Sequence, residues 1–220
     1  MREGLNNMKN IQFVTAVHGN EIMPTLALAS IGEAQIVANP RALSMGVRFT
    51  EHDLNAAFAT DGDSYEEKRA RELDQLLERE KLVVDFHSFS IESAPFAIVV
   101  DLEMLPLASS LGVEHVVYMK HNIKGGHALI DHHRGVSVEV GRHDDPKSFD
   151  KTLQIVKKLK KALADPGKVK VYEVYGRIEE RGNYVNFEEK NGVIPVLYGE
   201  RAYDSLGFYG LAAREITGTI

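Results

Sequence analysis

The first forty residues alternate between short apolar runs and polar breaks. Ile11 to Val17 is a brief, β-branched run that predicts a buried strand. An apolar segment of helical length follows from Ile22 to Ile31, and Pro24 falls in its first turn, where a missing N–H group costs little. Ala34 to Ala38 predicts a second strand, which ends at Asn39-Pro40. This strand–helix–strand opening is typical of an α/β sheet covered by helices.

The next part of the chain is more polar. A long loop is expected from Arg41 to about Asn55. A charged helix follows from about Ser64 to Arg79, with Ser64 as its N-cap and Glu67 at the capping-box position. Leu82 to Phe86 then predicts another buried strand, and His87 comes directly after it.

Apolar runs continue to alternate with helical patterns up to about residue 164. A helix is predicted from Leu102 to Leu111. A longer amphipathic helix is predicted from Lys147 to Ala164, where apolar side chains recur near the helical period. Three further strands are predicted, at residues 96–100, 115–118 and 136–140.

The composition shifts at Asp165-Pro166-Gly167. Beyond it, apolar and polar residues alternate, as in Val169, Val171, Glu173 and Tyr175, and glycines separate short strands. We therefore expect a main domain over residues 9–166 and a small β-rich domain over residues 167–220.

Composition narrows the chemistry. The net charge of −6 argues against a nucleic-acid partner, because phosphate contacts need a basic face. The absence of cysteine excludes disulfides and thiolate metal sites, so any metal must bind His, Asp or Glu. No stretch has the length of a membrane span or the apolar core of a signal peptide, so we expect a cytoplasmic protein without a membrane partner.

The first candidate ligands stand at a strand-to-helix turn. His18 and Glu21 have the spacing His-x-x-Glu, which brings both side chains to one side of the turn. Gly19 allows the turn to be tight. The alternative is a polar pair that satisfies itself at the start of a helix.

A second pair of polar residues ends the next predicted strand. Asp85 and His87 share one face of that strand, because side chains alternate along it. Two His and one carboxylate, with a water in the fourth position, form a catalytic zinc shell, so His18, Glu21 and His87 are the candidate ligands. Asp85 is a candidate to orient one of the histidines. The alternative is a buried Asp–His pair beside the core.

Glu139 stands out within the valine-rich run from Val136 to Val140. An unpaired buried charge is rare, so a Glu in such a strand needs a role. We expect it to take a proton from the zinc-bound water and pass it to the leaving group. The alternative is that Glu139 faces solvent, since it and Ser137 alternate with the valines.

Six segments together resemble the succinylglutamate desuccinylase/aspartoacylase family of zinc carboxypeptidase-like amidohydrolases. They are HGNE (18–21), NPRA (39–42), VRFTEHDLN (47–55), DFHS (85–88), VSVEVG (136–141) and GERAY (199–203). The resemblance implies an α/β fold, with a zinc carboxypeptidase-like mixed sheet flanked by helices and a small C-terminal β-rich domain. It implies one zinc ion (Zn2+) per chain on His18, Glu21 and His87.

The resemblance also implies roles around the metal. Glu139 matches the general base and acid, and Arg48 matches the arginine that stabilises the oxyanion. Asn55 matches a substrate-binding position, and Tyr203 matches a tyrosine that reaches the substrate from the C-terminal domain.

One departure concerns the substrate. The family's usual run is DLNRxF, and this chain has Ala56 where the substrate-binding arginine stands. Arg134 and Arg142 are the candidates to replace that cation, with Arg134 preferred. We expect a deacylase that cleaves the amide or ester bond of a small acylated compound, such as an N-acyl amino acid. A carboxypeptidase-like peptidase and a non-catalytic metal-binding module remain alternatives, and a homo-oligomer stays open.

Overall fold

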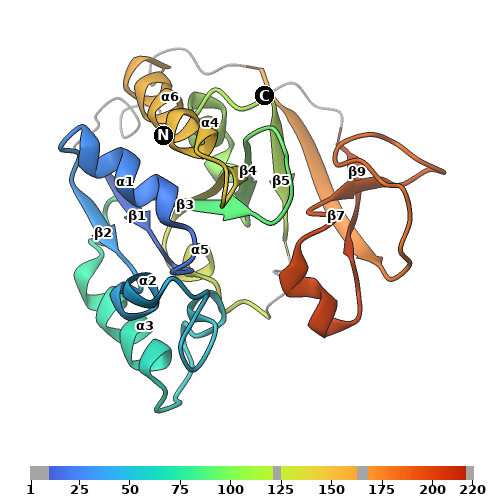
Figure 1. Ribbon diagram of the computed structural model, residues 1–220. Coiled ribbons are helices and arrows are strands. Elements are labelled where there is room, and N and C mark those ends of the chain that lie inside the picture. The colour runs from blue at the N-terminus through green and yellow to red at the C-terminus, as the bar shows by residue number, and fades with distance from the viewer. Residues whose placement is uncertain (1–9, 121–124, 163–167, 217–220) are drawn as a thin grey trace.

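The computed structural model describes residues 10–120, 125–162 and 168–216. Within these residues, nine strands form one sheet in the order β2-β1-β3-β6-β4-β5-β7-β9-β8 (Figure 1). The strands are β1 (Ile11–Thr15), β2 (Gln35–Val37), β3 (Leu82–Phe89), β4 (Phe96–Val99), β5 (His115–Tyr118), β6 (Gly135–Arg142), β7 (Lys170–Ile178), β8 (Ile194–Val196) and β9 (Gly210–Glu215).

Helices connect most of these strands. None of those in the described residues is long and apolar enough to cross a membrane. The α-helices are α1 (Ile22–Ser30), α2 (Pro40–Met45), α3 (Tyr65–Leu76), α4 (Leu105–Ser110), α5 (Leu129–His132) and α6 (Lys147–Ala162), and the 3-10 helices are η2 (Leu54–Ala56), η3 (Leu102–Met104) and η4 (Arg201–Leu206).

The sheet is mixed. β2, β1, β3 and β6 run parallel to one another, and β4 pairs with β6 in the antiparallel direction. β5 and β7 then follow the direction of β4. The predicted α/β class, with a mixed sheet flanked by helices, is confirmed.

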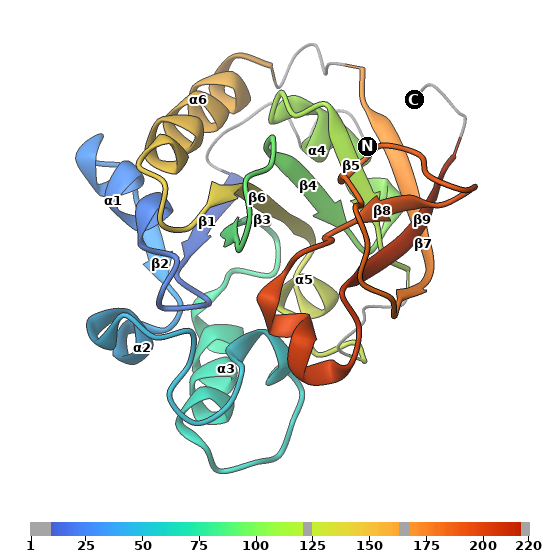
Figure 2. The ribbon, with the colours of Figure 1, turned by 45° about the vertical axis from the view of Figure 1, so that its right-hand side comes forward.

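Strand alternation sends apolar and polar side chains to opposite faces. Val84 and Phe86 of β3 pack in a buried cluster with residues of α1, α4 and α6. These helices lie together on one side of the sheet in Figures 1 and 2. Asp85 and His87 therefore point to the other face.

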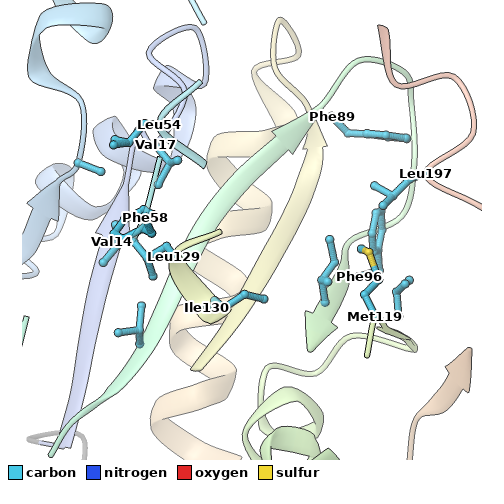
Figure 3. Packing of buried hydrophobic residues seen from close by; sticks show 14 of the residues in the cluster. Val14, Val17, Leu54, Phe58, Phe89, Phe96, Met119, Leu129, Ile130 and Leu197 are labelled. Atoms are coloured by element: carbon cyan, nitrogen blue, oxygen red, sulfur yellow. The ribbon is translucent and has the colours of Figure 1, made fainter. Parts of the chain in front are cut away.

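That other face carries a second apolar cluster. It joins β1 and β3 to α3, to α5 and to the segment that follows β8. Figure 3 shows Val14, Leu54, Phe58 and Leu129 packed together on one part of this face, with Met119 farther along the sheet. The polar side chains of β3 on this face thus lie between two parts of this cluster, one around Phe58 and the other around Met119.

The long loop expected after Arg41 is wrong in part. Residues Pro40–Met45 form α2, because the side chain of Asn39 accepts a hydrogen bond from the N–H of Ala42 and Pro40 suits the first turn. A short 3-10 helix, η2, also begins within the expected loop, at Leu54. The sequence Asn39-Pro40 thus marks a helix start as well as a strand end.

Other boundaries move by a few residues. The capping box of Ser64 and Glu67 is confirmed, but α3 ends at Leu76, before the expected Arg79. β3 runs on to Phe89, so His87 lies within the strand. The predicted last helix residues, 163 and 164, lie outside the described residues.

The expected β-rich character of the C-terminal part is present in β7, β8 and β9. These strands continue the main sheet, because β7 pairs with β5 in parallel. The division of the chain into domains at 9–166 and 167–220 stays a prediction.

Gly19 permits close packing between the ligand turn and α2. A Cβ atom on Gly19 would lie 2.1 Å from the carbonyl carbon of Ala42 and 2.3 Å from the nitrogen of Leu43. We expect Gly19→Ala to push α2 away and to destabilise the protein by about 2 kcal/mol or more, with loss of bound zinc. Urea unfolding and metal analysis measure both effects.

Gly32→Ala is the matched control. Gly32 has a φ of +64°, and its Cβ would meet nothing within 4 Å. Its substitution should cost about 1 kcal/mol through the backbone alone and leave zinc content unchanged. Equal losses in the two variants would contradict the packing explanation.

Candidate metal centre

Three buried side chains meet in one cluster, two from the turn after β1 and one from the neighbouring strand β3. His18 and Glu21 lie in the turn between β1 and α1, and His87 lies on β3, which pairs with β1 in parallel. One ligand atom from each lies within 4.8 Å of the others. The exposed fractions are 4%, 1% and 3%, so water competes little for these groups.

The two histidines are oriented in the same way. Nδ1 of His18 lies 2.7 Å from Oε1 of Glu21, and Nδ1 of His87 lies 3.2 Å from Oε2. The Nε2 atoms point to other carboxylates. That of His87 is 2.6 Å from Asp85, and that of His18 is 3.2 Å from Asp53. The two Nδ1 atoms and Glu21 thus face one point, and each ring has a carboxylate behind it.

Asp53 was missed by the sequence reasoning. It stands in the segment VRFTEHDLN, but 35 residues separate it from His18, and no local spacing links the two. Asp85 orients His87, its partner two residues along the same strand. It also accepts a hydrogen bond of 3.2 Å from the hydroxyl of Ser137 on β6.

The charges of the cluster suit a cation. Burial opposes ionisation of Glu21, but His18 and His87 outweigh it and hold the pKa of Glu21 well below its ordinary value. Burial also opposes protonation of His87, but Asp85 and Glu21 raise the pKa of His87 well above its ordinary value. Positive charge is therefore favoured between these side chains, and two imidazoles with one carboxylate fit a catalytic zinc ion.

Glu139 lies beside the cluster on the next strand. It pairs in register with His87 across β3 and β6, and its exposed fraction is 9%. Its Oε2 atom is buried without a hydrogen-bond partner among the described residues. Burial raises the pKa of Glu139, and Glu21 and Glu200 add to that effect. The alternative of a solvent-facing Glu139 is wrong, because this face of β6 is covered.

Arg48 approaches the cluster from the loop after α2. Its Nη2 atom lies 3.4 Å from Asp53, and its Nη1 atom lies 3.9 Å from both Glu21 and Glu200. Burial alone would lower the pKa of Arg48, but Asp53, Glu21 and Glu200 raise it. The guanidinium is therefore a fixed positive charge beside the candidate ligands.

Glu200 is a further buried acid that the sequence reasoning did not single out. It accepts hydrogen bonds from the backbone N–H groups of Ser90, at 3.1 Å, and Ala202, at 3.2 Å. It thereby ties η4 to the end of β3 and faces Arg48. The segment GERAY contains this residue, but nothing in its local pattern shows that it is buried.

The predicted substrate residues divide into two groups. Asn55 and Tyr203 line the pocket above the cluster. The Oδ1 atom of Asn55 accepts a hydrogen bond of 3.1 Å from the N–H of Leu129, and Tyr203 is 7% exposed. Both therefore stand in the wall of the pocket that holds the cluster.

Neither arginine proposed to replace the missing cation lines the pocket. Arg134 precedes β6, about 16 Å of strand away from Glu139, and its side chain is 64% exposed near Glu103. Arg142 ends β6 with an exposed side chain that pairs with Asp144. Ala56 lies in η2, where its carbonyl oxygen faces a ring nitrogen of His52 at 3.4 Å.

The candidate ligands share one pocket with Glu139 and Arg48, and its cavity volume is ≈ 80 Å³. Among the lining residues that the structure describes, Arg48 is the only lysine or arginine. The lining residues are His18, Glu21, Arg48, Asn55, His87, Ser88, Ile98, Met119, Ala128, Ile130, Ser137, Glu139, Leu197, Glu200 and Tyr203.

Two neighbouring histidines, His132 and His133, have partners of their own away from the candidate ligands. His133 is 4% exposed, and its Nε2 atom lies 2.7 Å from Asp74 of α3. His132 lies 2.9 Å from the carbonyl oxygen of Gly126. These contacts hold α5 in place, since a buried polar ring needs partners.

The loop that carries Arg48 and Asp53 is held by one buried carboxylate. Glu66, in the first turn of α3, accepts hydrogen bonds from Asn39 and from both the N–H and the hydroxyl of Thr50. The N–H groups of residues 51 and 52 also donate to it, each at 3.1 Å. Burial opposes ionisation, but these donors lower the pKa of Glu66 to about 2.

We expect Glu66→Gln to loosen this loop and to destabilise the protein by about 1–3 kcal/mol near neutral pH. The folded-state pKa lies below the ordinary value, so the stabilisation is present above about pH 4.3 and is lost as the pH falls toward 2. The difference between wild type and variant in urea unfolding should therefore narrow between these values.

Glu67→Gln is the control on the same helix. Glu67 caps α3 through Ser64, and no hydrogen bond links it to residues 50–52. The Glu67→Gln substitution should lower the free energy of unfolding by about 1 kcal/mol and leave the zinc content unchanged. A pH-independent difference for Glu66→Gln would refute the carboxylate's role.

The fold and the cluster together define a class: α/β proteins with a buried His-Glu-His cluster, able to hold a metal ion, beside two parallel strands. The profile of the succinylglutamate desuccinylase/aspartoacylase catalytic domain matches residues 7–163 of this chain. The chain belongs to this family, as the six segments indicate.

Solved structures share the fold. Murine aminoacylase 3 has a TM-score of 0.74 and 18% sequence identity, over 94% of this chain and 95% of that one. Succinylglutamate desuccinylase from Chromobacterium violaceum has a TM-score of 0.69 and 18% identity, over 94% and 85%. The ectoine utilization protein EutE (DoeB) from Ruegeria pomeroyi, in a product-bound structure, has a TM-score of 0.62 and 16% identity, over 96% and 82%.

Proposed function

We propose that this chain is a zinc-dependent deacylase that hydrolyses the amide or ester bond of a small acylated compound, such as an N-acyl amino acid. The main support is one arrangement: the buried His18–Glu21–His87 cluster has Glu139 on one side and Arg48 on another. Bond cleavage by hydrolysis needs a metal site, a proton carrier and an oxyanion donor, and each has a candidate in this pocket.

His18, Glu21 and His87 would hold one zinc ion. When bound, zinc supplies a water of lowered pKa as the nucleophile and polarises the acyl carbonyl. Asp53 and Asp85 keep the two imidazoles turned toward Glu21, because each holds an Nε2 atom. The site is thus rigid before substrate arrives, which lowers the cost of reaching the reactive geometry.

Glu139 carries the proton. Its free Oε2 atom accepts a proton from the attacking water, and the protonated carboxyl then donates it to the leaving nitrogen or oxygen. Arg48 donates to the oxygen that gains negative charge as the carbonyl becomes tetrahedral. Glu200 and Asp53 hold the guanidinium in place.

The peptidase alternative has less support. Recognition of a peptide's terminal carboxylate requires a cation besides the oxyanion donor. Among the described lining residues, Arg48 is the candidate cation, and it already faces Asp53. Hydrolysis of any acyl amide or ester by the zinc-loaded protein would exclude the non-catalytic alternative.

Substituting Glu139 tests the proton carrier. We expect Glu139→Gln to lower kcat by about 10²–10⁴ while zinc stays near one equivalent, because Glu139 is not a ligand. Activity on a panel of acyl amides and esters, with metal analysis, measures both. Glu114→Gln, on an exposed glutamate, is the control and should retain full activity. Unchanged turnover by Glu139→Gln would overturn the assignment.

Substituting Arg48 tests the oxyanion donor. Arg48→Met should lower kcat by about 10²–10³, since the contact forms mainly in the transition state. Arg134→Met removes an exposed arginine that lies away from the pocket and should leave kcat/KM within about twofold of wild type. A large loss for Arg134→Met would restore it as a substrate residue and contradict its position outside the pocket.

A further inference from the structure

The pocket is chemically uneven along the sheet. Its candidate ligands come from β1 and β3, and Glu139 comes from the next strand, β6. The lining also includes five aliphatic side chains: Ile98 on β4, Met119 directly after β5, Ala128 and Ile130 at α5, and Leu197 after β8. We call these five residues the apolar end of the pocket.

The apolar end has a defined size and position. β4 is two strands from β3, which is about 10 Å at ordinary strand spacing. The five aliphatic residues have exposed fractions between 3% and 9%. Figure 3 shows Met119 and Leu197 gathered beside β4, and Ile130 lies on α5. A substrate held at the candidate metal centre would need a substituent several carbon atoms long to touch this wall.

The charges of the lining residues indicate whether that substituent is charged or neutral. Glu21, Glu139 and Glu200 line the pocket, and among its described lining residues Arg48 is the lysine or arginine that faces them. Arg48 contacts acids at the candidate metal centre. Among the described residues, no lysine or arginine lines the aliphatic wall, so a substrate carboxylate placed there would lose its water without gaining a cation from them, which is strongly unfavourable.

We propose that Ile98, Met119, Ala128, Ile130 and Leu197 form a subsite for an uncharged, aliphatic or aromatic substituent, so that the substrates are N-acyl compounds without a carboxylate at this position. This specificity rests on the deacylase function proposed above. The wall selects by excluding charge and by contact with the apolar group.

Two pairs of compounds test the preference. N-acetylleucine and N-acetylaspartate have side chains of nearly equal shape that differ in charge, and so do N-(4-methylpentanoyl)glycine and N-succinylglycine. The first pair varies the amine side of the scissile bond, and the second varies the acyl side. For the zinc-loaded protein we expect kcat/KM to favour the neutral member of at least one pair by about tenfold or more.

Binding provides a readout that does not depend on turnover. Zinc-loaded Glu139→Gln should bind the same four compounds without cleaving them, and calorimetry should give the same order of Kd. Tighter binding or faster cleavage of the acidic member in both pairs, or equal values, would overturn the apolar subsite. Neutral-selective binding by a wild-type protein that cleaves nothing would refute the deacylase function and leave the subsite standing.

A pair of methionines locates the preference. Met119 and Met104 are 6% and 5% exposed, but Met104 packs in the cluster on the opposite face of the sheet. Met119→Ala should weaken binding of the preferred neutral compound by about tenfold and change the acidic one little. Met104→Ala should lower thermal stability to a similar degree without altering either Kd. Equal effects of the two substitutions on the ratio of Kd values would place the subsite elsewhere.

Discussion

The carboxylate of Glu21 lies at the centre of the site, and much of the surrounding structure compensates its burial. A carboxylate that is 1% exposed must be paired to remain ionised. The two imidazoles face its oxygens, and the N–H of Ser88 donates to it at 2.9 Å. This arrangement requires the turn after β1 to lie against the end of β3. The parallel pairing of these strands therefore serves the site as well as the core.

Successive layers of carboxylates extend from that point. Asp53 and Asp85 hold the far sides of the two imidazoles. Glu200 faces Arg48, and Glu66 holds the loop that carries Arg48 and Asp53. Each acid has hydrogen-bond donors of its own, so the negative charges do not simply repel one another. The result is a rigid set of side chains that favours a cation at its centre.

The mixed sheet places this polar site next to an apolar wall. The parallel half, from β2 to β6, brings its strand ends together and supplies the candidate ligands and Glu139. β4 then reverses direction, and Ile98 on β4 and Met119 after β5 bring aliphatic side chains to the lining. Under the proposed function, bond cleavage and recognition of the apolar substituent would therefore use different parts of one sheet.

The sequence by itself determined many of the elements and the candidate ligand set. His18 and Glu21 share a turn, and Asp85 and His87 share a strand face, so short spacing was enough to predict their proximity. Alternation could not decide whether Glu139 meets solvent or the site, because a period of two shows which residues share a face but not which face is covered. Only the tertiary structure showed that Glu139 is buried in the pocket wall, beside the candidate ligands.

The contacts that the sequence did not reveal all join distant segments. Asp53 meets His18, Glu200 meets Arg48, and Glu66 holds residues 50–52, in each case through chain folding rather than local spacing. Arg134 is near Glu139 in sequence but precedes β6, and the extended strand between them keeps the two residues apart. Spacing within a turn or strand thus determined the candidate ligands, whereas the residues that orient, charge and shape the pocket were decided by packing between elements.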